Sequence, residues 1–239
     1  MSSVVLRPAA SLPPFPVSFA AQLPAPYPVS AARAEFLKYV GLVCMLFDHF
    51  SKFLGWSCFL SHPLGRMTFP LFAAAASVQI CRPCVPVRVF RRLLVCSVLV
   101  LPVFYFVCRE PILPAIFTLG AGGLLWAFLA SAPDFRSLRP LLVLFGLLVL
   151  SCFGEYSVFG AVYVAGLALV LRRPGSSLGW SFFLVGVLGQ FWTEGAWQLV
   201  ACLGAPLLLF VAPPVPRVRR LFLSVYLLQW PIFAAVALA

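Results

Sequence analysis

The sequence predicts an all-α polytopic membrane protein, a bundle of about nine transmembrane helices with its N-terminus in the cytoplasm. Of the 239 residues, 63% are hydrophobic and 10% are charged, whereas soluble domains have roughly 45–50% apolar and 25% charged residues. Apolar runs near the length that crosses about 30 Å of hydrocarbon alternate with short loops. Basic residues gather in every second loop, which is typical of membrane proteins.

Residues 1–35 are rich in Pro, Ala and Ser and are predicted to form a disordered tail. Prolines such as Pro13, Pro24 and Pro28 break any helix that begins there. A secretory signal needs an uninterrupted apolar core after a basic start. Arg7 is the one basic residue of positions 1–32, and prolines interrupt the apolar residues after it, so we expect no cleaved signal.

Residues 36–239 form the predicted transmembrane domain. Nine apolar runs cover 36–57, 64–81, 90–107, 112–130, 139–153, 156–171, 178–194, 197–212 and 220–237. The fifth and sixth runs are short and are separated only by Gly154 and Glu155. They either cross the membrane fully or form a tight helical hairpin that stops short of full depth.

The distribution of Lys and Arg predicts the orientation. With the N-terminus in the cytoplasm, all but three of the 17 basic residues fall in cytoplasmic segments, the exceptions being Lys52, Arg66 and Arg109. This matches the bias of Lys and Arg toward cytoplasmic loops. The net charge of +11 therefore reflects topology, and we expect a lipid bilayer as the surroundings and no nucleic-acid partner.

The remaining polar residues concentrate near the outer ends of the predicted spans. Several carboxylates and cations fall there, together with one histidine: Asp48, His49, Lys52, Arg66, Arg109, Glu110, Glu155 and Glu194. Charges inside membranes are expensive and mark functional sites by default. Any acid–base chemistry of this protein is therefore predicted to face outward.

The first span carries the most informative spacing. Lys38 and His49 project from one helix face about 16 Å apart along its axis, while Asp48 and Lys52 are four residues apart and can pair. Near neutral pH, a His is well suited to accept a proton. Two simpler interpretations stay open, in which Lys38 is a snorkelling anchor and Asp48 forms a structural ion pair with Lys52.

The eight cysteines predict neither a disulfide framework nor a metal site. Most lie singly in apolar runs, where Cys behaves as a small hydrophobic residue. The one C-x-x-C, Cys81 to Cys84, has no second pair or nearby His to complete a zinc site.

Five sequence elements resemble one family. The segment "FLKYVGLVCMLFDHF", which holds Lys38 and His49, and "GRMTFPLFAA" (65–74) look like the first two spans of TraX proteins. "IFTLGAGGLL" (116–125) and "GEYSVFGAVYV" (154–164) resemble two later elements, with Glu155 where Asp is usual. "RRLFLSVYLLQWPIF" (219–233) resembles the closing segment, with Gln229 near where a His is usual.

The resemblance covers about residues 36–235 and implies a TraX-like transmembrane acyltransferase domain in the bacterial inner membrane. It also implies a relation to the membrane acyltransferase-3 superfamily, acetyl-CoA as the acyl donor, and acetylation of the N-terminus of a pilin or another exported acceptor. Two alternatives from other classes are a small-molecule transporter and a non-catalytic factor in pilus or secretion-system assembly.

The resemblance also leads to expected roles for individual residues. We expect Lys38 to hold the anionic nucleotide end of CoA, His49 to act as general base oriented by Asp48, and Arg66 to stabilise oxyanion charge. A further polar cluster, which either binds substrate or is structural, comprises Lys52, Glu155, Tyr156 and Glu194.

Overall fold

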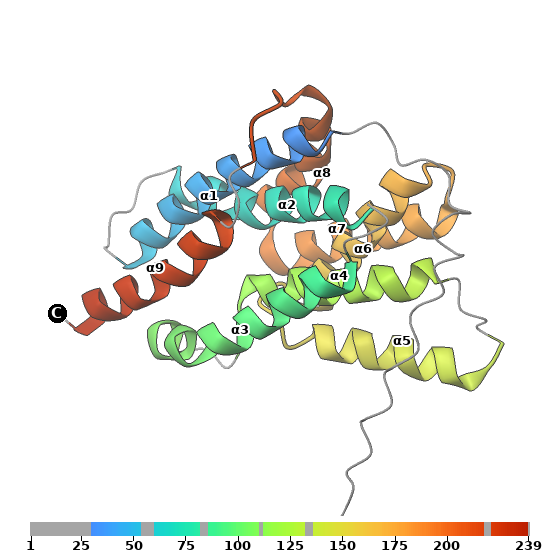
Figure 1. The fold of residues 1–239 in the computed structure, drawn as a ribbon, viewed down its shortest axis with the longest axis horizontal. Coiled ribbons are helices and arrows are strands. Elements are labelled where there is room, and N and C mark those ends of the chain that lie inside the picture. Colours follow the sequence, from blue (N-terminus) through green and yellow to red (C-terminus); the bar gives the residue numbers. More distant parts are fainter. Residues whose placement is uncertain are drawn as a thin grey trace, which may run out of the picture.

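The chain forms a bundle of helices. The computed structural model describes residues 30–53, 60–81, 86–109, 112–131, 136–217 and 221–238. Within these ranges there are nine helices and no strand, with one isolated β-bridge between Leu113 and Gly154. The helices are α1 (Ala31–Phe53), α2 (Ser61–Ile80), α3 (Pro86–Cys108), α4 (Ala115–Ala130), α5 (Leu138–Ser151), α6 (Ser157–Arg172), α7 (Ser177–Glu194), α8 (Ala196–Val211) and α9 (Leu221–Leu238) (Figure 1). Each predicted apolar run coincides with one of these helices.

The boundary of the predicted tail is wrong by five residues. Helix α1 begins at Ala31, so residues 31–35 are helical rather than disordered. Ala and Arg favour helix, and Ala34 and Glu35 are buried, so packing extends the helix beyond its apolar run. Residues 1–29, like the predicted end of the first run at 54–57, lie outside the described residues.

Helix α6 is the core of the bundle, with nearly all of its residues from Gly160 to Arg172 buried. It packs closely on α7 through two glycines: a Cβ on Gly166 would meet the backbone of Phe183, and one on Gly186 would meet the backbone of Tyr163. Small residues of this kind let helix backbones approach in membrane proteins. The buried thiol of Cys81 donates to the Ala168 carbonyl of α6 at 3.2 Å, whereas Cys84 lies outside the described residues.

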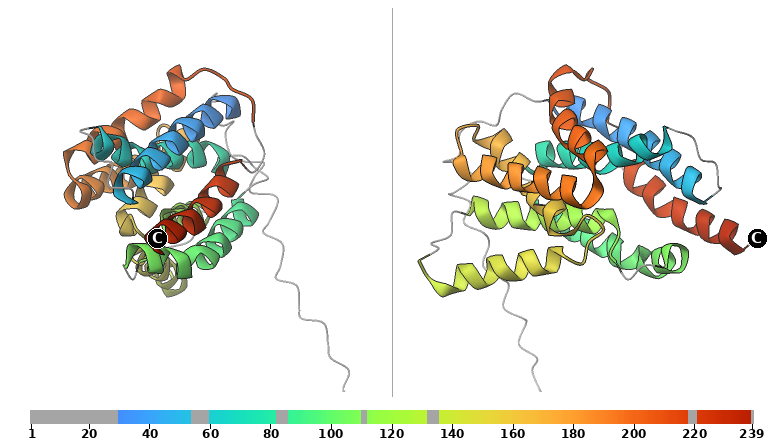
Figure 2. Two further views of the ribbon diagram at one scale, coloured as in Figure 1. Left: turned by 90° about the vertical axis from the view of Figure 1, so that its left-hand side faces the viewer. Right: turned by 180° about the vertical axis from the view of Figure 1, so that it is seen from behind.

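Helix α5 lies at the edge of the bundle (Figures 1 and 2). It exposes Leu141, Leu142 and Phe145. Its 14 residues span about 21 Å, and the 16 residues of α6 span about 24 Å. Both lengths are below the roughly 30 Å of bilayer hydrocarbon.

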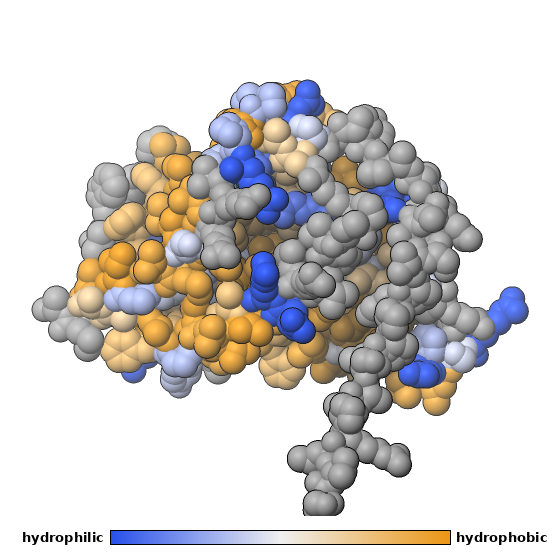
Figure 3. All heavy atoms as spheres, in the orientation of Figure 1, coloured by the Kyte–Doolittle hydropathy of each residue, from blue (hydrophilic) through white to orange (hydrophobic). Residues whose placement is uncertain are grey.

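The surface of the bundle is compatible with a membrane protein. Large apolar side chains on α5, α7 and α8 are exposed, and orange apolar surface covers much of the face in Figure 3. Among the described helices, α3 is long and apolar enough to cross a membrane, over Arg91–Cys108. Five other apolar helices have 10 to 17 residues.

Candidate functional site

Two adjoining cavities lie where α1 ends and α2, α4 and α6 begin. We call the cavity that contains His49 the inner chamber and the other the outer vestibule. They share four lining residues, Asp48, Gly65, Glu155 and Tyr156. Figure 2 (left) looks onto this end of the bundle, where α1 and α9 finish.

The inner chamber is mainly apolar and contains His49. The His49 Nδ1 lies 3.0 Å from the Oε1 of Gln229 on α9. Because an amide oxygen only accepts hydrogen bonds, Nδ1 must carry the proton and Nε2 must be the basic nitrogen. The rings of Trp230 and Phe233 pack on the imidazole, with centroids 5.3 and 5.7 Å away. The imidazole is therefore held in one tautomer and one position.

The orientation of His49 differs from the one expected from sequence. We expected Asp48 to hold the ring, but Gln229 makes the hydrogen bond to Nδ1. The Gln229 Nε2 lies 3.8 Å from the Met45 sulfur, a weak acceptor, which agrees with the amide oxygen facing His49. Asp48 instead pairs with Lys52, Oδ2 to Nζ at 2.7 Å.

Gly65 makes room for the Asp48 carboxylate. A Cβ built on Gly65 would collide with the Asp48 carboxyl group, so that carboxylate lies directly against the backbone of α2. The glycine of the "GRMTFP" segment therefore has a steric role at the boundary between the two cavities.

The outer vestibule is lined by side chains of both charges. Arg66 on α2 forms an ion pair with Glu194 at the end of α7, and Lys52 and His62 also line the cavity. Glu155 follows α5, and its Oε2 accepts from the backbone N–H of Ala115, the first residue of α4, at 3.0 Å. A negative charge at this position is favoured by the helix dipole.

Tyr156 lies beneath the vestibule and joins three helices. Its ring stacks on Phe69 with centroids 4.0 Å apart, and its backbone carbonyl accepts from Gln190 Nε2 at 3.0 Å. Gln190 in turn accepts from Gln198 at 3.1 Å. This buried network fixes the start of α6.

The structure thus brings together seven of the eight site residues selected from sequence: Asp48, His49, Lys52, Arg66, Glu155, Tyr156 and Glu194 all line one or both cavities. The eighth, Lys38, lines neither. Its Nζ pairs with Glu35 Oε1 at 2.8 Å, and Gln79 Nε2 donates to the same oxygen at 3.2 Å.

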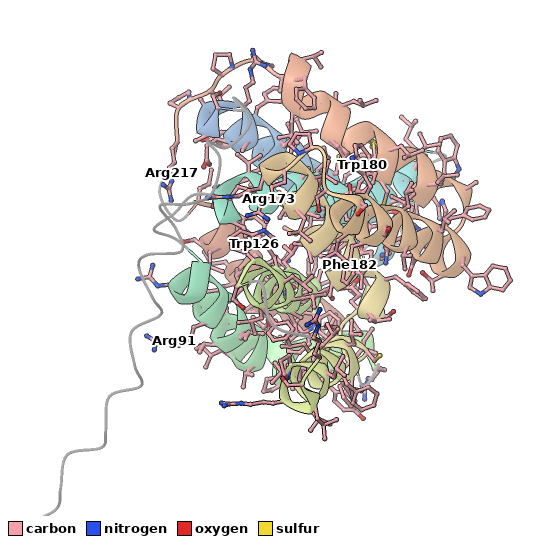
Figure 4. All side chains as sticks on the ribbon, turned by 90° about the vertical axis from the view of Figure 1, so that its right-hand side faces the viewer. Arg91, Trp126, Arg173, Trp180, Phe182 and Arg217 are labelled. Carbon is pink, nitrogen blue, oxygen red and sulfur yellow. The ribbon has the colours of Figure 1, made fainter. Side chains whose placement is uncertain are left out.

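Lys38 belongs to a basic end of the bundle, opposite the vestibule. Figure 4 looks onto this end and shows Arg91, Arg173 and Arg217, which come from three separate parts of the chain. The Arg217 Nε also lies 3.8 Å from Glu35 Oε1. Glu35 is therefore surrounded by cations and amide hydrogens.

The inner chamber extends from His49 toward that basic end. Its lining includes Phe72 and Phe222, whose ring centroids are 4.3 Å apart. The Phe72 ring packs on Gly41, where an added Cβ would be 3.2 Å from it. On α1 the lining of the chamber begins at Met45, so the chamber follows α1 over about 6 Å of the roughly 16 Å between Lys38 and His49.

Three polar residues at the inner chamber were not selected from sequence: Thr68 and Trp230, which line it, and Gln229, which is hydrogen-bonded to His49. Gln229 drew notice only as a difference from the TraX pattern. A polar residue in an apolar span was the signal that could have found Thr68 and Gln229. The direction in which each side chain points depends on packing between helices far apart in the sequence.

Comparison with known proteins supports one family. Searches of curated proteins and of solved structures found no match. The family model "TraX protein" matches residues 33–237, which includes both cavities and nearly all of the nine described helices. This match confirms the resemblance seen in the sequence elements and indicates a role related to conjugation. The chain belongs to the TraX protein family.

Proposed function

We propose that this protein is a membrane-embedded acyltransferase of the bacterial inner membrane, with its N-terminus in the cytoplasm. It would transfer the acetyl group of acetyl-CoA to the N-terminal amine of a pilin-like exported protein, as a relative of the acyltransferase-3 superfamily. The observation that carries this proposal is the geometry of His49. Its imidazole is fixed by Gln229 at 3.0 Å in a mainly apolar chamber that adjoins a charged vestibule.

Such a site suits proton transfer from an amine. The acceptor nitrogen attacks the thioester carbonyl carbon, and the Nε2 of His49 takes the proton that the nitrogen loses. The C–S bond then breaks, and the leaving thiolate of CoA accepts that proton from the imidazolium. The apolar walls of the chamber keep water from competing with the amine.

The vestibule would receive the acceptor. Two of its three carboxylates are paired with cations, Asp48 with Lys52 and Glu194 with Arg66, so Glu155 leaves the lining with a net negative charge, which favours an approaching ammonium group. Arg66 lines the vestibule but not the inner chamber, and it is paired with Glu194. We therefore assign Arg66 to the shape and charge of the vestibule, which replaces its expected role at the oxyanion.

The donor would enter from the basic end. Arg and Lys favour phosphate groups. Arg173 and Arg217 lie at that end (Figure 4), together with Lys38, which is paired with Glu35 and would exchange that carboxylate for a phosphate. The pantetheine arm would then run along α1 and reach His49 in the inner chamber, whose lining on α1 extends from Met45 to His49, about 6 Å of the roughly 16 Å to Lys38. The tilted rings of Phe72 and Phe222, the first of which packs on Gly41, lie on the remainder of that path and would have to move to admit the arm.

Replacing His49 by Ala tests the proposal. Purified protein in detergent is mixed with acetyl-CoA and a synthetic peptide with a free amino terminus, and the peptide is weighed by mass spectrometry. We expect His49→Ala to lose at least 100-fold in rate, because general bases contribute roughly 10²–10⁴-fold. His62→Ala is the matched control, since His62 is exposed at the rim of the vestibule.

Two results would overturn the proposal. One is full acetylation by the His49→Ala variant, and the other is equal acetylation of a peptide whose amino terminus is blocked. A non-catalytic assembly factor would show no acetyl transfer with any variant, and a transporter would move a solute without consuming acetyl-CoA.

A further inference from the structure

Two buried hydrogen-bonding groups at the inner chamber make no well-formed hydrogen bond among the described residues. They are the hydroxyl oxygen of Thr68 on α2 and the indole nitrogen of Trp230 on α9, which faces the buried Tyr226 hydroxyl without a well-formed bond to it. Both residues line the chamber that contains His49, and Trp230 is 2% exposed. Buried polar groups in proteins are nearly always hydrogen-bonded, so each of these needs an explanation.

The chemistry of the two groups defines what they can bind. The indole N–H of Trp only donates, so its partner must offer a lone pair. A Thr hydroxyl within a helix commonly bonds to the carbonyl four residues earlier, but the hydroxyl of Thr68 makes no such bond. Each group can therefore donate to an acceptor such as a carbonyl oxygen, and both residues line the same, mainly apolar chamber.

Thr68 and Trp230 both belong to segments that help to position the proposed general base, His49, or its neighbour Asp48. Trp230 follows Gln229 in α9, and the Trp230 ring lies 5.3 Å from the His49 ring between centroids. The same short segment of α9 thus holds the imidazole and supplies a donor. Thr68 comes one turn after Gly65, the residue against which Asp48 packs, so both donors are attached to elements that already position His49 or Asp48.

We propose that Thr68 Oγ1 and Trp230 Nε1 form the oxyanion site, donating to the carbonyl oxygen of the acyl thioester; this rests on the proposed function. When the acceptor nitrogen bonds to the carbonyl carbon, the C=O electron pair moves onto that oxygen. Two neutral donors stabilise the negative charge there. The electron pair on the oxygen then re-forms the C=O bond as the C–S bond breaks, and the sulfur leaves with the electrons of the C–S bond.

Neutral donors suit this position better than a guanidinium. In a medium of low dielectric constant, fixed dipoles aimed at a developing charge are effective and need little reorganisation. An unpaired cation in the same space would be costly to bury. This agrees with the location of Arg66, which lies in the vestibule and is neutralised by Glu194.

The test compares Thr68→Val with Thr68→Ser. Val keeps the shape of Thr without the hydroxyl, and Ser keeps the hydroxyl without the methyl. We expect Thr68→Val to lower kcat about 10²–10³-fold, the range found for removing one oxyanion donor, with little change in the KM for acetyl-CoA. Thr68→Ser should keep kcat within about threefold of the unmodified protein, a much smaller effect than loss of a donor.

A thermal measurement separates chemistry from folding. Because the Thr68 hydroxyl is unpaired in the free protein, Val at this position should melt at or above the temperature of the unmodified protein. Trp230→Phe keeps an aromatic ring on His49 but removes the N–H, and should also lower kcat without raising the KM for acetyl-CoA.

The three variants distinguish a wrong oxyanion assignment from a wrong acyltransferase proposal. If His49→Ala is inactive while Thr68→Val and Trp230→Phe keep full kcat, the oxyanion assignment is wrong and the acyltransferase proposal stands. Equal losses in Thr68→Val and Thr68→Ser would show a packing role and would also overturn the assignment. If His49→Ala keeps full activity, the proposed function itself fails.

Discussion

Replacing Gln229 by Met measures how much the hydrogen bond between Gln229 and His49 contributes to the rate of acetyl transfer. Met has nearly the volume of Gln but offers no strong acceptor, so the chamber keeps its shape while the Nδ1–H of His49 loses its partner at 3.0 Å. The Nδ1–H donates more strongly once the ring has become an imidazolium, so loss of its acceptor should penalise the transition state by about 1–3 kcal/mol. At about 1.4 kcal/mol per factor of ten, kcat should fall roughly 5- to 150-fold.

The assay is acetyl transfer from acetyl-CoA to a peptide with a free amino terminus, expressed per mole of folded protein. Gln198→Met is the matched control. Gln198 is also fully buried and donates to Gln190 at 3.1 Å, but it lines neither cavity. We expect that variant to be less stable yet to keep its kcat. The reasoning is refuted if Gln229→Met retains the kcat of the unmodified protein or loses no more than Gln198→Met.

Three further substitutions test the packing around the site. Gly65→Ala should lower the acetyl-transfer rate without lowering the melting temperature, because its Cβ would displace the carboxylate of Asp48; an unchanged rate would contradict this. Gly186→Ala should destabilise the fold by about 1–3 kcal/mol, seen as a lower melting temperature in detergent, because its Cβ would meet the backbone of α6. Glu155→Ala should cost about 0.5–2 kcal/mol, as loss of a helix cap does, since Glu155 accepts from the first N–H of α4 at 3.0 Å; Glu155→Gln, which keeps an acceptor, should recover most of this stability.

The number and order of the helices could be predicted from the sequence because each helix here is an apolar run ended by loop residues. The start of α1 could not, since Ala31 to Glu35 are helical through intrinsic preference and burial rather than hydropathy. Helices α5 and α6 are both short apolar runs in the sequence, but α5 is peripheral whereas α6 is the core of the bundle. That difference arises from close packing through Gly166 and Gly186.

The charged part of the site was predictable because charges in apolar spans are few and costly. Asp48, Arg66 and Glu194 occupy three different helices, yet alternation of helix direction alone places them at one end of the bundle. The partner of His49 was not predictable in this way. Gln229 is 180 residues away, and only the docking of α9 against α1 decides that its amide, rather than the adjacent Asp48, reaches the ring.

The contact between Gln229 and His49 has a consequence for biosynthesis. Helix α1 is synthesised before the other described helices and α9 after them, so the histidine exists before the residue that fixes its tautomer. A nascent chain in which α1 to α8 have formed holds every charged group of the vestibule but lacks the acceptor on Nδ1 and one wall of the chamber. The proposed reactivity toward a thioester would therefore begin only when α9 docks.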